Sequence, residues 1–342
     1  MVSIDGSIGE GGGQVLRVAV AMAAIMDTSL KVTNIRAGRE TEGLRPSHVT
    51  AVKAVAQLCN AGLEGAEVGS TELRFKPEGL RGGTFMLDVG TAGSISLVLQ
   101  AMLPPAISSG ERVEVEITGG TDVPGAPTIQ YVRQVLFPVL RGMGAQLDLE
   151  VARRGFYPEG GGRVKVVVES GSSVKPLAPT GPQPKPIISG EIAVSRLEQD
   201  ITDRVKRAMV RRLQGLPLGV LDVDLVEANG AGVSATLWAP RRAGAIGGAD
   251  VGKRSYPAER LGETAASSIA RALRADADVD EHLLDQLLLY CLMATGRSSF
   301  SCESVSSHAQ TVLSVAQEFT NFTKEIQNDG RRKRVVIDGE GL

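Results

Sequence analysis

The residues best suited to chemistry in this 342-residue chain are its three histidines, His48, His282 and His308. His308 stands in "SVSSHAQTVL", where serines precede an apolar helical pattern, so we expect it in the first turn of a helix. The positive end of the helix dipole disfavours imidazolium there, which keeps a neutral, nucleophilic ring available and also attracts anions. Taken alone, such a histidine is more often a cap or a surface residue, and His282 in "DEHLLDQ" more often a partly buried helix residue.

A carboxylate stands among glycines in "GEGGGQVLR", directly before an apolar stretch. The spacing fails the dinucleotide-binding fingerprint, and the chain holds no G-x-x-x-x-G-K-[ST] phosphate loop. In a functional interpretation Glu10 holds a divalent metal, Mg²⁺ or Mn²⁺, while backbone amides and Arg17 face phosphate oxygens. A glycine-rich turn with a solvated Glu10 is the alternative.

A cluster of cations lies in "IRAGRETEGLRPSH", which places Arg36, Arg39, Arg45 and His48 within 13 residues. Arginines stay charged and pair with phosphates through two hydrogen bonds, so this cluster suits a polyphosphate or an RNA end. A solvated loop, with His48 in the first turn of a helix, fits the same letters.

The composition is that of a globular protein, with 42% hydrophobic and 22% charged residues. A net charge of -2 argues against a non-specific nucleic-acid coat, although a local basic groove remains compatible with it. Three cysteines without metal spacing, Cys59, Cys291 and Cys302, predict free buried thiols in a reducing cytoplasm. We expect neither a signal peptide nor a membrane span.

Two stretches of the first half follow the same pattern. Helix starts near Gly11 and Ala92 lie 81 residues apart, and those at Arg45 and Pro127 lie 82 apart. Alternating segments such as "SLKVTNI" and "ERVEVEI" predict strands between the helices. The pattern predicts a duplicated unit of about 80 residues in the order β-α-β-α-β-β.

The C-terminal part predicts a third copy without its opening. "DEHLLDQLLLYCLMATG" predicts a helix closed by Gly296, and "SSHAQTVLSVAQEFT" a second helix, each followed by a strand. A Pro/Gly/Ser-rich linker, "GSSVKPLAPTGPQPKP", precedes a segment with its own β and α pattern, in which "AGAIGGADVG" is interpreted as a flexible loop. The predicted organisation is a large domain of residues 1–184 and 276–342, with a small α/β domain, 185–275, inserted.

Seven stretches in order carry a resemblance: "DGSIGEGGGQVLR", "IRAGRETEGLRPSHVTAVKAV", "GTAGSISLVLQAMLPP", "GGTDVPGAPTIQYV", "GFYPEGGGRV", "DEHLLDQL" and "SSHAQT". Together they resemble the motifs of the RNA 3′-terminal phosphate cyclases, from about Asp5 to Thr311. The resemblance implies an α/β fold of three β-α-β-α-β-β repeats packed as one large domain, with a small α/β domain inserted in the third repeat. Enolpyruvyl transferases share the repeat but use other chemistry.

The resemblance implies an ATP-dependent enzyme that converts an RNA 3′-phosphate into a 2′,3′-cyclic phosphate and releases AMP and pyrophosphate. His308 falls on the family's nucleophile, which forms a histidyl-AMP intermediate. The superfamily also contains non-catalytic relatives that act in ribosome assembly and lack this histidine, and such an RNA-binding protein is the alternative. A plain RNA-binding module fits poorly with the net charge and with an aromatic content of 4%.

Other roles carry over by position. Glu10 matches the metal-binding glutamate, Arg17 and Arg39 match phosphate contacts, and His48 matches a histidine of the same pocket. The nucleotide contacts fall on Gln100, His282, Leu283, Leu284, Asp285 and Gln286. The chain departs from the family at Glu42, Ser47 and His282, where proline, glutamine and an aromatic residue are usual; the first two departures weaken the expected phosphate contacts.

Overall fold

The first two repeats have the same strand order. The computed structural model describes residues 1–90 and 92–342, so Thr91 of "GTAGSISLVLQAMLPP" lies outside the described residues. In the first repeat the sheet order is β1-β2-β4-β3, with β1 parallel to β2 and the other pairs antiparallel. Its elements are β1 (Val2–Asp5), α1 (Gly13–Ile25), β2 (Leu30–Thr33), α2 (Pro46–Leu58), β3 (Gly62–Glu64) and β4 (Leu73–Lys76).

The second repeat follows the same scheme, with sheet order β5-β6-β8-β7 and the same parallel and antiparallel pairs. Its second helix is continuous through three segments, the middle one π-helical, and its apolar stripe of Ile129, Val132, Leu136 and Val139 is buried. The elements are β5 (Gly83–Asp88), α3 (Ile95–Ser108), β6 (Val113–Gly119), α4 (Ile129–Tyr131), η1 (Val132–Leu136), α5 (Phe137–Gly142), β7 (Leu147–Arg153) and β8 (Gly162–Val168).

The third repeat lacks a full opening strand, which is reduced to one parallel bridge between Val279 and Cys302. Its sheet order is β13-β15-β14, and its elements are α8 (Glu281–Met293), β13 (Thr295–Cys302), α9 (Ser307–Gln317), β14 (Thr323–Asp329) and β15 (Arg332–Glu340). The predicted closure of α8 by Gly296 is wrong, because Gly296 lies inside β13. The end of α8 packs instead on β15, where a Cβ on Gly339 would lie 2.1 Å from the carbonyl oxygen of Ala294.

A fourth sheet lies between the second and third repeats, with strand order β10-β9-β11-β12 and an apolar cluster of its own. Two helices pack on it and on each other, as the contacts of α6 with α7 and of α7 with β12 show. The elements are β9 (Ile188–Ser195), α6 (Gln199–Arg212), β10 (Leu218–Leu225), β11 (Gly232–Arg241), β12 (Gly244–Val251) and α7 (Ala258–Arg274). We call residues 185–275 the inserted segment.

The interpretation of "AGAIGGADVG" as a flexible loop is wrong, because most of it is strand β12, paired with β11 from Gly244 to Val251. Its glycines are required by close packing. A Cβ on Gly248 would lie 2.3 Å from the carbonyl oxygen of Ala265 in α7, and one on Gly247 would lie 2.6 Å from Val135 in η1. Because glycine has no side chain, α7 and η1 can both pack close to the backbone of β12.

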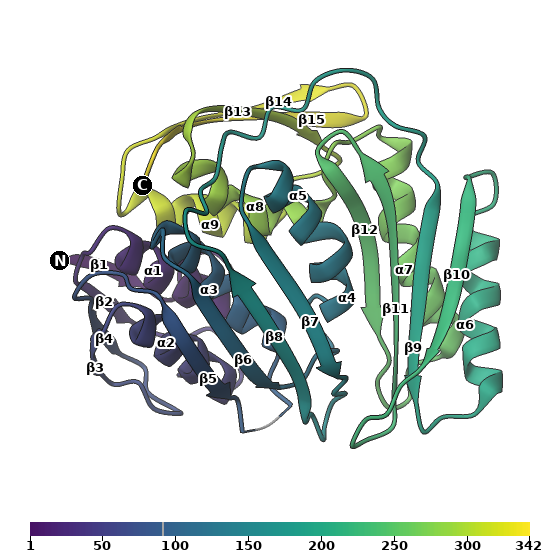
Figure 1. The fold of residues 1–342 in the computed structure, drawn as a ribbon, viewed down its shortest axis with the longest axis horizontal. Helices are drawn as coiled ribbons and strands as arrows, with labels where there is room; N and C mark the ends of the chain where they lie inside the picture. The colour runs from purple at the N-terminus through teal and green to yellow at the C-terminus, as the bar shows by residue number, and fades with distance from the viewer. Residues whose placement is uncertain (91) are drawn as a thin grey trace.

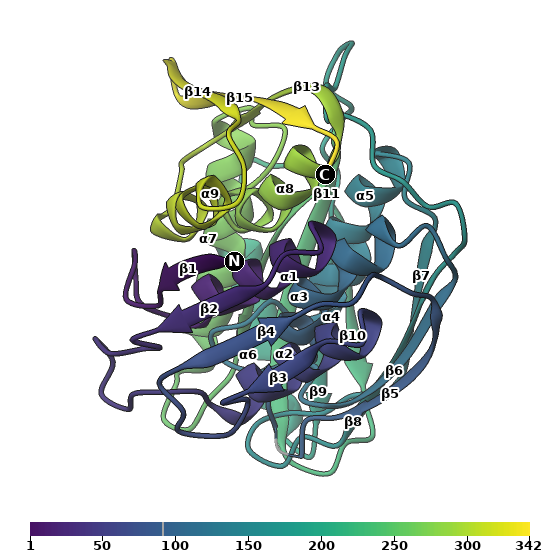
Figure 2. The same ribbon diagram turned by 90° about the vertical axis from the view of Figure 1, so that its left-hand side faces the viewer.

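The main core is one apolar cluster that draws on all three repeats. Helix α1 packs against α2, α3 and α9, and α8 packs against α3 and α9. Figures 1 and 2 show these helices in the interior, with the three repeat sheets outside them. Among the described residues, no helix is long and apolar enough to cross a membrane.

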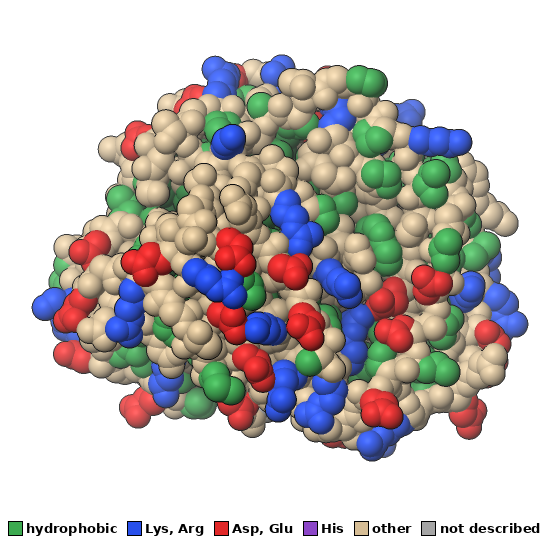
Figure 3. Space-filling view, in the orientation of Figure 1, with side chains coloured by type: hydrophobic (Ala, Val, Ile, Leu, Met, Phe, Trp, Pro, Cys, Tyr) green, Lys and Arg blue, Asp and Glu red, His purple; other side chains and the backbone are tan. Residues whose placement is uncertain are grey.

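The outer face of the second sheet carries charges of both signs. Lys165 Nζ lies 2.6 Å from a carboxylate oxygen of Glu114, and Arg163 Nε lies 3.2 Å from one of Glu116, on neighbouring strands. Figure 3 shows acidic and basic side chains interspersed over this face. This face is therefore mixed in charge rather than basic.

Candidate active site

The start of α9 meets the glycine-rich loop before α1. The Nδ1 atom of His308 lies 3.3 Å from Oε2 of Glu10, and Ser307 donates a hydrogen bond to Oε1 of the same carboxylate. Arg39 donates to the carbonyl oxygen of Glu10 at 2.8 Å and lies 3.8 Å from its carboxylate. About half of the His308 side chain is exposed, so its ring is held by Glu10 yet remains accessible.

Serines fix the first turn of α9, as the sequence predicts. The hydroxyl of Ser306 caps the helix by accepting a hydrogen bond from the backbone N–H of Ala309 at 2.9 Å. The same hydroxyl donates to Asp285 on α8 at 2.5 Å. The cap therefore joins α9 to α8 and sets the direction in which His308 leaves the helix.

The glycines around Glu10 make room for side chains from other elements. Gly9 has a φ of +62°, and a Cβ there would lie 2.3 Å from the hydroxyl of Thr311 in α9. A Cβ on Gly13 would lie 2.2 Å from Nε2 of His48 and 2.9 Å from Nη1 of Arg17. The backbone of the loop therefore comes close to Thr311, His48 and Arg17, while Gly9 and Glu10 themselves remain exposed.

His48 is a buried, neutral histidine. Its Nδ1 accepts a hydrogen bond from the backbone N–H of Arg45 at 3.1 Å, which leaves the proton on Nε2, the atom beside Gly13. Burial lowers the pKa of His48 to about 3, and the charges of Arg17, Arg36 and Arg45 add to the effect. His48 therefore presents an N–H donor at neutral pH.

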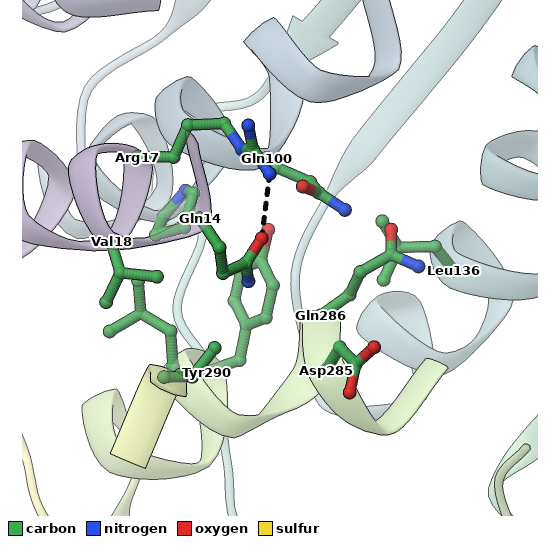
Figure 4. Close-up of a pocket in the computed structure, with 11 residues that line it drawn as sticks. Gln14, Arg17, Val18, Gln100, Leu136, Asp285, Gln286 and Tyr290 are labelled. Atoms are coloured by element: carbon green, nitrogen blue, oxygen red, sulfur yellow. Dashed lines mark hydrogen bonds between the residues drawn. The ribbon is translucent and has the colours of Figure 1, made fainter. Parts of the chain in front are cut away.

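Arg17 is buried next to His48, and burial lowers the pKa of its guanidinium to about 10, so it remains a cation at neutral pH. It donates to Gln14 at 2.8 Å, a bond drawn in Figure 4. Its Nε has no hydrogen-bond partner among the described residues. A buried cation with a free donor is suited to an anionic ligand.

A cavity of about 420 Å³ opens beside His308. Side chains from all three repeats line it, among them Arg17, Gln100, Tyr131 and Asp285. A smaller hollow of about 20 Å³, shown in Figure 4, adjoins it and shares Arg17, Gln100, Asp285 and Gln286. The larger volume is in the range of sites that hold a nucleotide-sized ligand.

Two amide side chains in the cavity are incompletely bonded. The Oε1 atoms of Gln100 and Gln286 are buried and lack a partner among the described residues, although Gln286 donates through Nε2 to the carbonyl oxygen of His282. Burial raises the pKa of Asp285 to about 7, and the negative charges of Glu281, Asp280 and Glu10 contribute to the rise. The carboxyl of Asp285 is therefore only partly ionised at neutral pH. These groups can bond hydroxyl and amine groups of a ligand.

The structure brings most of the predicted site residues together and separates two. Glu10 contacts both Arg39 and His308; Arg17 and His48 flank Gly13; Gln100, His282, Asp285 and Gln286 line the cavity. Leu283 and Leu284 instead pack their side chains in the main core. Any nucleotide contact they make would use the backbone.

Sequence reasoning missed several residues of the site, among them three with polar side chains. Ser307 bonds Glu10, Tyr131 lines the cavity, and Asp250 of β12 lines it from the inserted segment. Ser307 and Tyr131 lie inside the motifs "SSHAQT" and "GGTDVPGAPTIQYV", which could have drawn attention to them. Asp250 lies in the stretch misinterpreted as a loop, so no signal pointed to it.

One buried carboxylate joins the walls of the cavity. Asp280 caps α8 by accepting from the backbone N–H groups of His282 and Leu283, and it accepts from Tyr131 Oη at 2.7 Å. Its other oxygen accepts from the backbone N–H of Gly247 in β12 at 2.8 Å. Asp280 therefore ties the second repeat, the third repeat and the inserted segment to one another.

The described residues include no group of three or more His, Cys, Asp or Glu side chains that could hold a metal ion. Glu10 offers carboxylate oxygens beside Arg39 and His308. This donor set fits a Mg²⁺ or Mn²⁺ ion that takes most of its ligands from phosphates and water, and it does not fit a cation held by protein alone.

Comparison with known sequences identifies the protein family. The sequence model of the family described as RNA 3′-terminal phosphate cyclase matches residues 8–326. The chain belongs to the RNA 3′-terminal phosphate cyclase family. Among relatives of that name, the protein of Nitrosospira multiformis is 41% identical over 338 residues, covering 98% of this chain and 96% of its own. That of Caldivirga maquilingensis is 40% identical, with 99% and 98% covered.

A solved structure, the enolpyruvyl transferase NikO from Streptomyces tendae, aligns with 100% of this chain and 49% of its own at 10% identity and a TM-score of 0.39. That likeness is too distant to bear on fold or activity. The cyclase relatives, by contrast, match along nearly the whole chain. The match with the cyclase family extends over both Glu10 and His308.

Proposed function

We propose that this protein converts the 3′-terminal phosphate of RNA into a 2′,3′-cyclic phosphate in an ATP-dependent reaction that passes through AMP bonded to His308. The observation that carries the proposal is the contact of His308 Nδ1 with Glu10 at 3.3 Å, at the edge of a nucleotide-sized cavity. A proton on Nδ1 faces the carboxylate, so the lone pair of Nε2 is free for attack.

In the first step Nε2 of His308 forms a bond to the α-phosphorus of ATP, and the bond to the bridging oxygen breaks, which releases pyrophosphate. Glu10 stabilises the positive charge that develops on the imidazole. Arg17 and the Nε2–H of His48, beside Gly13, and Arg39, beside Glu10, would bind phosphate oxygens. A divalent cation held by Glu10 would neutralise triphosphate charge.

In the second step an oxygen of the RNA 3′-phosphate attacks the AMP phosphorus, and the bond to His308 breaks. The neighbouring ribose O2′ then attacks the activated 3′-phosphorus and expels AMP, with its proton released to water. Vicinal placement gives this closure the high effective molarity of an intramolecular reaction. Cleavage of ATP into AMP and pyrophosphate supplies the driving force.

Incubation with α-labelled ATP and Mg²⁺ or Mn²⁺ tests the first step. We expect an acid-labile, alkali-stable adduct that His308→Ala abolishes and that Gln310→Ala, an exposed change two residues on, leaves intact. An adduct that survives His308→Ala would refute the assignment. An oligoribonucleotide with a 3′-phosphate should then become resistant to phosphatase, which tests cyclisation itself.

A reducing compartment, the cytoplasm, forms part of the proposal. It is supported by Cys59, Cys291 and Cys302, which are all buried and free. Burial raises the pKa of each thiol to about 12, so these cysteines are unreactive core residues rather than participants in the reaction.

A further inference from the structure

The inserted segment supplies one wall of the cavity beside His308. Ala249, Asp250 and Val251 at the end of β12 line it, together with Thr264 of α7. The role of this segment in the reaction is not explained by the histidine and the phosphate-binding side chains, all of which lie outside it. Among its lining residues only Asp250 carries a charge.

The two ends of the cavity differ in charge. Arg17 on α1 makes one end cationic, with His48 beside it, whereas Asp250 on β12 makes the other end anionic. Figure 1 shows α1 and β12 on opposite sides of α4 and α8. A triphosphate is attracted to the Arg17 end and repelled from Asp250, so a nucleotide with its α-phosphorus at His308 extends its base toward β12.

The second carboxylate of the cavity does not alter this polarity. Asp285 receives a hydrogen bond from Ser306, two residues from His308, so it lies at the level of the reacting phosphate and the ribose. Leu97, Ala126 and Pro127 line the space as well and offer apolar surface for a flat base. The base end therefore combines apolar walls with one acceptor, the usual make-up of a specific ligand pocket.

The carboxylate of Asp250 is held in place by two donors. Its Oδ1 accepts from the backbone N–H of Val251 at 2.9 Å, and its Oδ2 accepts from Tyr256 Oη at 2.7 Å. Tyr256 is in turn 3.1 Å from the hydroxyl of Thr264, another residue of the cavity wall. Each oxygen keeps acceptor capacity for one more donor, and the carboxylate offers no donor of its own.

We propose that Asp250 selects the nucleotide base by accepting a hydrogen bond from the exocyclic amine of adenine. A base with a keto oxygen at that position, as in ITP or GTP, would place two acceptors against each other and leave the carboxylate unpaired. The assignment rests on the proposed function, in which ATP is the nucleotide. A hydrogen bond to a charged group is worth about tenfold to hundredfold in affinity, so wild type should favour ATP over ITP by at least about tenfold.

The experiment compares ATP with ITP in two readouts on the full chain: equilibrium binding without RNA, and the rate of adduct formation at His308. Asp250→Asn presents an amide that can donate as well as accept, so the ATP preference should fall to about threefold or less. Asp250→Ala should abolish it. Tyr256→Phe, which removes one of the two donors, should give an intermediate preference. Asp222→Asn, an exposed change on β10 of the same segment, should retain the wild-type ratio.

The outcomes separate this inference from the proposed function. Equal binding of ATP and ITP by wild type, or a ratio unchanged in both Asp250 variants, overturns the role of Asp250 even when His308 forms its adduct. Selective binding that depends on Asp250, without any adduct, supports the base assignment and refutes the histidyl mechanism. Binding of neither nucleotide refutes both.

Discussion

Glu10 and His308 come from opposite ends of the chain, yet Oε2 of one lies 3.3 Å from Nδ1 of the other. The contact is made because α1 and α9 pack together, which brings the glycine-rich loop onto the first turn of α9. Ser307 holds the second oxygen of the same carboxylate. Glu10 therefore orients the histidine in addition to any role it has toward a cation.

Glu10→Gln should slow adenylylation of His308 by about a hundredfold, because a neutral amide neither stabilises developing imidazolium nor binds a cation well. The measurement is single-turnover adduct formation at saturating ATP over a range of metal concentrations. Rescue by excess metal would assign the loss to cation binding rather than to orientation. Glu67→Gln, an exposed change outside the site, serves as the control.

Gly13→Ala should weaken ATP binding by tenfold or more, because its Cβ would lie 2.2 Å from His48 Nε2 and force that ring and Arg17 to move. Binding is measured by titration calorimetry. Gly38→Ala is the matched control, since a Cβ there would meet no described atom within 4 Å. Equal affinities in the two variants would show that the close packing at Gly13 has no bearing on the ligand.

Asp280→Ala should lower the free energy of unfolding by about 3 kcal/mol, since it leaves Tyr131, Gly247 and the first turn of α8 without their buried acceptor. Tyr131→Phe removes a single bond and should cost about 1 kcal/mol. Urea unfolding measures both. A loss in Asp280→Ala no larger than that in Tyr131→Phe would contradict the joining role given to this carboxylate.

The pH dependence of stability should depend on His48. Its pKa is about 3 in the folded protein against 6.5 for the free group, so the unfolded chain binds the extra proton between these values. The stability contributed by His48 is complete above pH 6.5 and falls as the pH drops toward 3, by about 1.4 kcal/mol per unit. In His48→Gln the free energy of unfolding should fall less steeply on acidification, by about 1.4 kcal/mol less per pH unit in this range.

Urea unfolding of wild type and His48→Gln at several values between pH 4.5 and 7 checks the prediction. Asp285 and Glu303 act in the opposite direction, because burial raises their pKa values to about 7 and about 8 and stability falls as they ionise. Both proteins share these carboxyls, so their effect cancels in the comparison. Parallel pH profiles would show that His48 is not buried in its neutral form.

Local patterns in the sequence predicted the elements well where one face of a helix or strand is apolar. The predicted helix starts near Gly11 and Ala92 fall within three residues of α1 and α3, and the serine cap of α9 is confirmed. The third sheet was predicted without β14, whose residues are all exposed and show no apolar face. Strand β12 was not predicted because a glycine-rich stretch is typical of a loop. Its glycines instead allow helices to pack closely against the strand.

The sequence by itself determined the repeats, the family and the candidate side chains of the site, because periodicity, caps and motifs are short-range properties of the chain. Only the tertiary structure decided that Glu10 meets His308, that Asp280 joins the second repeat, the third repeat and the inserted segment, and that Asp250 lines the cavity. Each of these contacts links residues far apart along the chain. Such contacts depend on how helices and sheets pack, which no local pattern encodes.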